Sequence, residues 1–180
     1  MVFSPYDNGV KAFKNYVCVN VITAKTIIQM KIRQATMADL AALATVFADY
    51  RSISGLAHNL EDGRTFLKER LEKKDSVIFI AIIDDEIVGF TLLFPFFTPA
   101  GIKEIWLLND IYIADEYRHQ GVAQSLLSEA VFFSKKTNKS KVYLATKADN
   151  VNSQTLFEKF GFRRTNYVNY EFITENNTQD

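Results

Sequence analysis

The chain has 180 residues, of which 48% are hydrophobic, enough to build the core of a folded domain and too many for a disordered chain. Its 21 basic and 21 acidic residues cancel, so no charge excess favours nucleic acid or an anionic membrane as a partner. The one cysteine excludes an internal disulfide, no apolar run approaches the roughly 20 residues of a membrane span, and the first residues lack the pattern of a secretory signal. We therefore expect a soluble cytoplasmic protein with no nucleic-acid or membrane partner.

Residues 1–29 stand apart from the pattern of strands and helices that begins at Met30. We expect them to form a peripheral or disordered extension, of the kind that translation from an upstream start produces. The alternative is an additional edge strand, because YVCVNVIT at 16–23 alternates like a strand. We assign the folded domain to residues 30–174 and a C-terminal tail to residues 175–180.

Downstream of Met30, apolar residues recur with helical spacing in some segments, and β-branched and aromatic residues gather in others. Thr36 and Asp39 have the spacing of a capping box at the first helix, with aspartate in place of glutamate. Asn152 is the expected N-cap of the last helix, which Gly161 ends. Strands are expected at 30–36, 76–83, 86–96, 103–113, 141–147 and 162–173, and helices at 35–50, 60–74, 121–136 and 152–161. This order predicts a mixed α/β sheet in one domain.

A short loop at 116–123 leads into the helix expected at 121–136. The N-terminus of a helix offers unpaired N–H groups and the positive end of the helix dipole, which together hold anions. Gly121 lets the backbone approach a ligand, Ala123 keeps the next contact small, and the guanidinium of Arg118 suits phosphate. The spacing matches neither G-x-x-x-x-G-K-[ST] nor G-x-G-x-x-G. The loop thus predicts a phosphate or pyrophosphate site, with an ordinary loop and a solvated arginine as the alternative.

The stretch IYIADEYRHQGVAQSLL, residues 111–127, resembles motif A of the GCN5-related N-acetyltransferase (GNAT) superfamily. That motif is an apolar strand, a short turn and [RQ]-x-x-G-x-[GA] opening a helix, and Arg118, Gly121 and Ala123 fill its fixed positions. Further on, DNVNSQTLFEKFGF resembles the later motif of the superfamily, which is matched by Asn150, Leu156, Gly161 and Phe162. The resemblance covers about residues 30–173.

The resemblance implies an α/β fold with a mixed, mostly antiparallel twisted sheet, helices on both faces and a splayed strand pair that holds CoA. It implies acetyl-CoA as the co-substrate and no metal ion. The pantetheine arm would be bound by the backbone of Ile111 and Ile113 and by the side chain of Asn150. The pyrophosphate would lie against the clamp loop, residues 118–123, with Arg118 at its head and with contacts, largely through backbone, from His119, Gln120, Gly121, Val122 and Ala123.

Within the superfamily, the run 108–113 most resembles the polyamine and histone acetyltransferase branch, which carries L-E-D-F-F-V there. A primary amine must lose a proton before it attacks, because an alkyl ammonium has a pKa of about 10. We expect Asp110 to order the ammonium and to relay its proton through water, with Asn109 beside it as the second catalytic position. The branch has glutamate in place of Asn109, and in place of Phe157 it has the tyrosine that protonates the departing thiolate. Phe157 has no proton to give, so we assign it to the CoA site rather than to catalysis.

Three details of the expected site stay open at this level. Strand alternation places Asn109 and Asp110 on opposite faces unless a bulge re-aims one of them, and Asp110 has the alternative of being a structural carboxylate. Trp106 either lines the acceptor pocket or belongs to the core. His58 and His119 lie far apart in the sequence, so we expect no metal site.

The expected function is the transfer of an acetyl group from acetyl-CoA to a primary amine of a small molecule, by direct attack within a ternary complex. The loss of one of two carboxylates favours a monocationic amine over a polyamine. Two alternatives are acetylation of a protein lysine or N-terminus, and non-catalytic binding of acyl-CoA. The oligomeric state is left open, with a homodimer among the options.

Overall fold

The computed structural model describes residues 12–13, 16–23 and 26–174. The chain divides into two compact units, of which the first ends at Ala145 and the second begins at Thr146. The two units are therefore described one at a time. Residues 1–11 and 175–180 lie outside the described part, so the expectations for them stay predictions.

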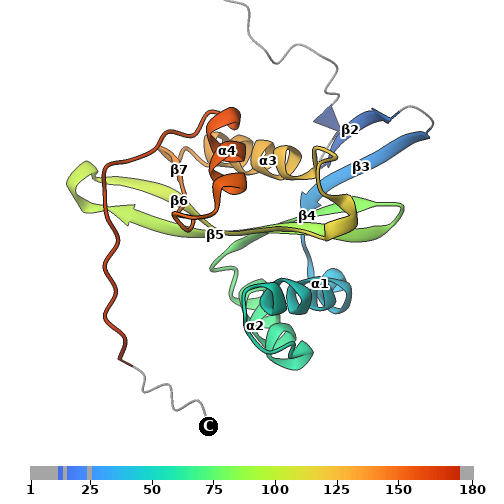
Figure 1. Ribbon diagram of the computed structural model, residues 1–180, viewed down its shortest axis with the longest axis horizontal. Helices are drawn as coiled ribbons and strands as arrows, with labels where there is room; N and C mark the ends of the chain where they lie inside the picture. The colour runs from blue at the N-terminus through green and yellow to red at the C-terminus, as the bar shows by residue number, and fades with distance from the viewer. Residues whose placement is uncertain (1–11, 14–15, 24–25, 175–180) are drawn as a thin grey trace, which may run out of the picture. The chain divides into compact units, whose positions relative to one another are not determined.

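In the described part of the first unit, seven strands form one sheet whose spatial order follows the sequence (Figure 1). Neighbouring strands from β1 to β6 are antiparallel, whereas β6 and β7 run parallel. The strands are β1 (Ala12–Phe13), β2 (Tyr16–Thr23), β3 (Thr26–Gln34), β4 (Val77–Ile83), β5 (Glu86–Thr98), β6 (Lys103–Ile113) and β7 (Val142–Tyr143).

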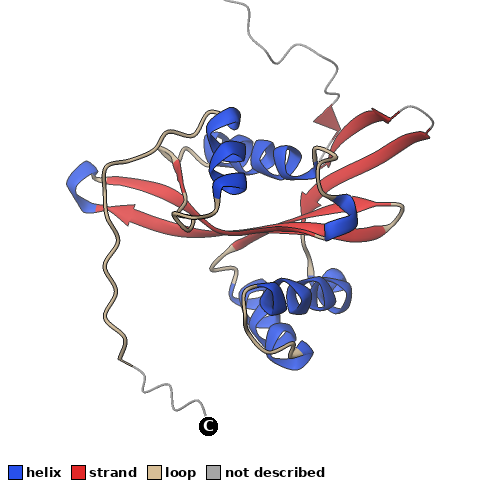
Figure 2. Ribbon diagram, viewed as in Figure 1, coloured by secondary structure: helices blue, strands red, loops and turns tan. Residues whose placement is uncertain are grey.

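Helices cover both faces of this sheet. Helices α1 and α2 lie on one face and α3 lies on the other (Figure 2). The helices of the first unit are α1 (Leu40–Ile53), α2 (Leu60–Lys73) and α3 (Val122–Lys136), with short 3-10 turns η1 (Met37–Asp39), η2 (Pro99–Gly101) and η3 (Asp115–Tyr117). The second unit contains α4 (Val151–Phe160). The expected α/β architecture, a mostly antiparallel sheet between helices, is confirmed.

Local signals in the sequence fix most of these boundaries. The Asp39 carboxylate accepts a hydrogen bond from the backbone N–H of Thr36 at 2.8 Å, which is the expected half of the capping box ahead of α1. Asn59 caps α2 by accepting from the N–H groups of the second and third residues of that helix. The β4–β5 hairpin turns at Asp84 and Asp85, whose φ angles of 50° and 64° suit a tight hairpin turn.

An aromatic and aliphatic core fills the space between the sheet and the α1–α2 pair. The ring of Phe47 on α1 stacks on Phe66 of α2 at 5.6 Å and lies 5.6 Å from Phe90 of β5. Buried side chains of both layers complete this cluster: Leu40, Leu43, Ala44, Leu67, Ile78, Ile80, Leu92 and Tyr112. Each fully buried leucine or isoleucine stabilises the layer contact by roughly 1.5–3 kcal/mol.

Helix α3 closes the opposite face of the sheet. Its Phe133 ring lies 5.4 Å from Phe79 and 5.3 Å from Trp106. The indole Nε1 of Trp106 donates to Oγ1 of Thr137 at 2.9 Å, so the polar atom of this buried ring is satisfied. Trp106 therefore belongs to the core under α3.

Three sequence expectations about elements are wrong. The strand expected at 141–147 is reduced to Val142–Tyr143, and the strand expected at 162–173 is absent from the described residues of that segment. The alternating pattern supplied strand propensity, but a strand forms only where a neighbouring edge pairs with its backbone. The N-cap of α4 is Asn150, whose side chain accepts from Ser153 N at 3.1 Å, and not Asn152, which lies inside the helix.

The expected first strand begins before Met30. Strand β3 starts at Thr26 and pairs with β2 from Thr23↔Thr26 to Val17↔Ile32. Residues 16–23 therefore form strand β2, which agrees with the alternative expectation that this part of the extension is a strand. A strand at this end of the sheet can still be peripheral to the fold, so the domain boundary at residue 30 stays a prediction.

Candidate active site

A β-bulge in β6 decides how Asn109 and Asp110 are oriented. Leu92 of β5 pairs with Asp110, but Leu93 pairs with Leu108, so Asn109 is an extra residue in β6. The bulge lets the two side chains meet: Nδ2 of Asn109 donates to Oδ2 of Asp110 at 2.8 Å. The two expected catalytic residues therefore lie together, although simple alternation would separate them.

The other oxygen of the Asp110 carboxylate is held from α1. The Tyr50 hydroxyl donates to Oδ1 of Asp110, and Thr91 Oγ1 donates to the Asp110 backbone carbonyl at 2.9 Å. Burial, followed by the hydrogen bond and the charge of Asp110, raises the pKa of Tyr50 to about 12. The phenol thus stays neutral and remains a donor over the physiological pH range.

Aromatic rings surround the Tyr50 end of this contact. The Tyr50 ring lies 5.5 Å from Phe90 in an edge-to-face arrangement, 5.7 Å from Phe47 and 5.9 Å from Tyr112. Burial, together with the charges of Asp49 and Asp115, raises the pKa of Tyr112 as well. The carboxylate of Asp110 is half-buried beside this apolar wall, where an ion pair is stronger than in water.

Sequence reasoning missed Tyr50 and Thr91. Phe47 and Tyr50 are three residues apart in α1, a spacing that is typical of the packed face of a helix and carries no signal of a functional site. Nothing in the sequence linked either Tyr50 or Thr91 to Asp110, because the three residues come from three different elements.

The clamp loop has the backbone geometry that an anion site needs. His119 and Gly121 have positive φ angles of 61° and 84°, and Gly121 is the N-cap of α3 without a side-chain cap. The first hydrogen bond of the helix runs from Ser125 N to Gly121 O at 3.0 Å. The N–H groups of the preceding helical residues therefore have no intrahelical partner and are available to an anion.

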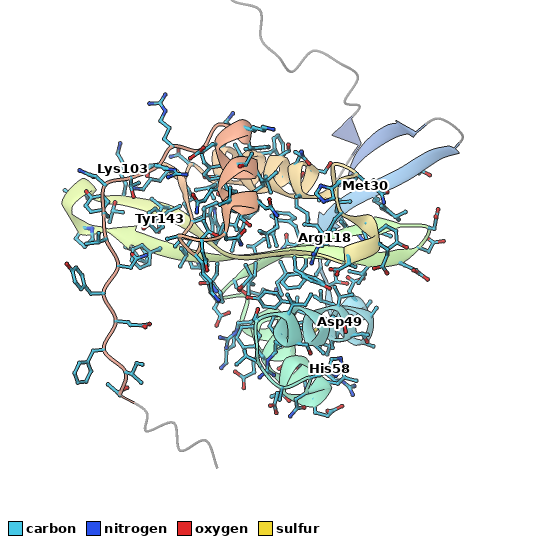
Figure 3. The ribbon with its side chains drawn as sticks, in the orientation of Figure 1. Met30, Asp49, His58, Lys103, Arg118 and Tyr143 are labelled. Carbon is cyan, nitrogen blue, oxygen red and sulfur yellow. The ribbon has the colours of Figure 1, made fainter. Side chains whose placement is uncertain are left out.

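Polar side chains of the clamp loop make hydrogen bonds and an ion pair within the protein. Arg118 donates from Nε to Ile113 O at 3.1 Å and pairs with Asp115 at 2.6 Å, while its side chain stays 44% exposed (Figure 3). Gln120 Nε2 donates to Glu116 O at 2.8 Å. Val122 is 1% exposed and packs into the protein, whereas a Cβ placed on Gly121 would meet no atom within 4 Å outside its own stretch of backbone.

One edge of β6 is open beyond its contact with β7. The parallel pairing consists of Trp106↔Val142 and Leu107↔Tyr143, and no strand of the described chain pairs with that edge further along. Ala114 N donates to Val88 O at 2.9 Å, toward β5, so strand alternation turns the N–H groups of Ile111 and Ile113 toward the open edge. The N–H groups of Ile111 and Ile113 therefore lie on the edge of β6 that no described strand pairs with.

The second unit carries the other two expected contacts. Asn150 uses its Oδ1 to cap α4, which leaves its amide N–H donors for another partner. Phe157 is buried, and its ring lies 5.8 Å from Phe162 in an edge-to-face arrangement. Because the two units are described separately, the roles of both residues at CoA stay predictions.

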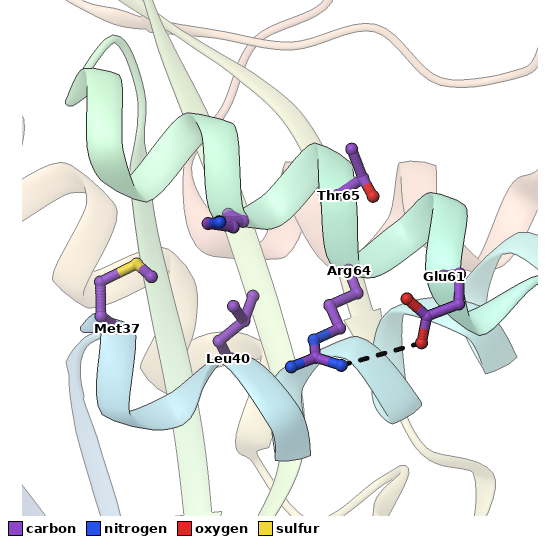
Figure 4. Close-up of a pocket in the computed structure, with 6 residues that line it drawn as sticks. Met37, Leu40, Glu61, Arg64 and Thr65 are labelled. Carbon is purple, nitrogen blue, oxygen red and sulfur yellow. Dashed lines mark ion pairs between the residues drawn. The ribbon is translucent and has the colours of Figure 1, made fainter.

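The rest of the described surface offers no second candidate for the active site. Nε2 of His58 lies 3.3 Å from Oδ1 of Asp49 (Figure 3). The described residues hold no group of three or more His, Cys, Asp or Glu side chains suited to a metal ion. No helix among the described residues is long and apolar enough to cross a membrane. A pocket between the start of α1 and helix α2 is lined by Met37, Leu40, Glu61, Arg64, Thr65 and Lys68 (Figure 4). It lies on different residues from Asp110 and the clamp loop, and its Arg64 pairs with Glu61 at 3.8 Å.

Comparison with known proteins identifies the family of the chain. Residues 41–162 match the acetyltransferase (GNAT) family model. The chain is 37% identical over 142 residues to the "Uncharacterized N-acetyltransferase YhfO" of Bacillus subtilis (strain 168). The aligned region covers 78% of this chain and 95% of that protein.

Solved structures share the fold. A crystal structure of "a probable acetyltransferase" superposes with a TM-score of 0.76 and 38% identity over 81% of this chain and 98% of the other. The aminoglycoside N-acetyltransferase AAC(6')-Iy in complex with CoA has a TM-score of 0.72 over 84% of this chain and 99% of the other, and its 19% identity shows the fold alone. The chain therefore belongs to the GNAT family of acetyltransferases and is an acetyl-CoA-dependent N-acetyltransferase.

Proposed function

We propose that this N-acetyltransferase acts on the primary amine of a small, monocationic molecule and that Asp110 is its catalytic carboxylate. The observation that supports this most is the pair of donors on Asp110, Tyr50 on Oδ1 and Asn109 on Oδ2, at a bulge in β6. Strand β6 also leads through η3 into the clamp loop, so one strand connects the carboxylate with the anion site.

Acetyl-CoA supplies the activated acetyl thioester. The clamp loop fits its pyrophosphate because the first turn of α3 is uncapped and the space at Gly121 is open. We assign the pyrophosphate to the backbone of residues 119–123, with the exposed part of Arg118 adding charge. The N–H groups of Ile111 and Ile113 on the open edge of β6 would hold the pantetheine arm. The roles of Asn150 and Phe157 at CoA stay predictions.

Asp110 performs two tasks in this proposal. Its negative charge attracts the ammonium form of the acceptor, and it then receives a proton through water, so that the neutral amine attacks directly within the ternary complex. A carboxylate has about four acceptor positions, of which Tyr50 and Asn109 use two. The remaining lone pairs are available to the amine or to the relaying water.

The departing thiolate takes its proton from water. Phe157 has no acidic proton, and the raised pKa of Tyr50 makes that phenol a weak acid near neutral pH. A thiolate is stable enough to leave without an acid, because an ordinary thiol has a pKa of about 8.5.

The charges at the site support the choice of acceptor. Asp110 carries a negative charge, whereas Asn109 is neutral and can only share hydrogen bonds. One carboxylate balances one ammonium group, which favours a monocationic amine over a polyamine. The second candidate activity is acetylation of a protein amine. We further propose a cytoplasmic location.

The test measures CoA release from acetyl-CoA with a panel of acceptors: phenethylamine, free amino acids, spermidine, kanamycin, and peptides with a free N-terminus or a lysine. Turnover with a monocationic amine, at a kcat/KM well above that with spermidine or peptides, supports the proposal. A preference for the peptides would favour the protein-directed activity instead. Tight CoA binding without release on any acceptor would show a non-catalytic binder.

A further inference from the structure

The hydroxyl of Tyr50 has a partner outside its own helix, although its ring is part of the core. The ring packs among Phe47, Phe90 and Tyr112, so its position is fixed by the contact between α1 and the sheet. The hydroxyl reaches out of this cluster and donates to Oδ1 of Asp110. A polar group that is anchored by a rigid aromatic ring is suited to hold a second group in one orientation.

We propose that Tyr50 is a positioning residue for acetyl transfer: it fixes the rotamer of the Asp110 carboxylate at the β6 bulge so that this carboxylate is ready for the acceptor amine. The inference rests on the proposed role of Asp110 as the catalytic carboxylate. Tyr50 holds Oδ1 from the helix layer while Asn109 holds Oδ2 from the bulge, so the carboxylate is restrained on both oxygens.

Two observations separate this role from that of an acid or of a purely structural residue. The raised pKa of Tyr50 keeps the phenol protonated, which suits a permanent donor better than a group that gives up its proton. The backbone carbonyl of Asp110 has its own partner, Thr91 Oγ1 at 2.9 Å, and the strand is already paired with β5. The strand is therefore anchored without the Tyr50 hydroxyl, which leaves the carboxylate as the group that the hydroxyl controls.

Besides Asp110, the groups that act electrostatically on this aromatic cluster are Asp49 on α1 and, near the end of β6, Asp115, Glu116 and Arg118. These groups are present in every variant below, so differences between variants report on Tyr50 and Asp110.

Tyr50→Phe tests the inference, because it keeps the ring and removes only the hydroxyl. With the best amine of the panel, we expect kcat/KM to fall about tenfold, the scale of one hydrogen bond to a charged group. The KM for acetyl-CoA should stay unchanged. Tyr112→Phe is the matched control, since it makes the same change in the same aromatic cluster, and it should retain nearly full activity.

A double variant distinguishes action through Asp110 from an independent effect. If Tyr50 acts through the carboxylate, Tyr50→Phe combined with Asp110→Asn should lose no more activity than Asp110→Asn alone. Additive losses, equal losses in Tyr50→Phe and Tyr112→Phe, or wild-type activity in Tyr50→Phe would each overturn the inference while the proposed function stands. A folded wild-type protein without turnover on any amine, or full activity in Asp110→Asn, would instead overturn the proposed function and the inference with it.

Discussion

Tyr50 of α1 and Asp110 of β6, 60 positions apart in the sequence, are joined by a hydrogen bond from the phenol to the carboxylate. The contact crosses from the helix layer to the sheet at the bulge that also turns Asn109 toward Asp110. One end of the candidate active site therefore depends on the packing of α1 against β5 and β6.

Asp110→Asn should lower kcat/KM by about 10²-fold or more and leave the affinity for CoA unchanged, because the amide cannot accept the proton of the acceptor amine. The amide keeps nearly the same shape but has a single acceptor oxygen, so one of the two donors, Tyr50 or Asn109, loses its partner. Raising the pH should recover part of the loss, since more of the amine is then already neutral. Steady-state kinetics from pH 6 to 10, with calorimetry for CoA, provide the measurement. Near-normal turnover at pH 7 would show that the proton leaves by another route.

Gly121→Val should abolish measurable CoA binding, because the branched side chain would occupy the open space beside the first turn of α3. The φ angle of 84° also makes any side chain at Gly121 strained, at a cost of about 1–2 kcal/mol. We therefore expect a fall in Tm of about 3–6 °C together with the loss of affinity.

Gly55→Val is the matched control for that experiment. Gly55 has a φ angle of 83° and, like Gly121, open space around a built Cβ, but it follows α1 far from the clamp loop in the sequence. It should show a similar fall in Tm and normal CoA affinity by calorimetry. Equal affinity in both variants would argue against the clamp loop as the pyrophosphate site.

A chain that starts at Met30 should fold and bind CoA like the full chain. The pairing of β3 with β4 begins at Met30↔Ile83 and continues to Gln34↔Phe79, so truncation at Met30 leaves this ladder complete. The pairings of β1 with β2 and of β2 with β3 are lost. Thermal unfolding and CoA titration of the two chains provide the comparison. A Tm lower by 10 °C or more, on the order of 3 kcal/mol, would mean that the first 29 residues belong to the folded domain.

Asp39 should stabilise the fold above pH 4 and lose this effect in acid. Hydrogen bonds from Arg33 at 2.7 and 2.6 Å, with smaller contributions from Thr36, lower the pKa of the Asp39 carboxyl from 3.8 to about 2. A carboxyl whose pKa is lower in the folded state stabilises it above the unfolded pKa, and the effect fades as the pH falls through the folded pKa.

The corresponding variant is Asp39→Asn. At pH 6 it should be about 1–2 kcal/mol less stable than the wild type, after allowance for solvent screening. Urea unfolding at pH 6, 4 and 3 should show this gap shrinking as the pH falls below 4. A gap that stays constant over this range would mean that Asp39 contributes through its caps alone and not through its charge.

The sequence by itself determined the features whose parts are neighbours along the chain. The clamp loop was predictable because its arginine, its glycine and the helix that follows lie within a few residues, and the hairpin and capping signals of β4, β5, α1 and α2 are equally local. Tertiary structure alone decided the features that depend on a partner far along the chain. The bulge at Asn109 is defined by the pairing of β6 with β5. The hydrogen bond from Tyr50 to Asp110 forms because α1 packs against the sheet. The strand expected at 162–173 did not form in the structure for the same physical reason: a strand pattern states a preference, but pairing needs an edge, and the sequence does not say where that edge lies.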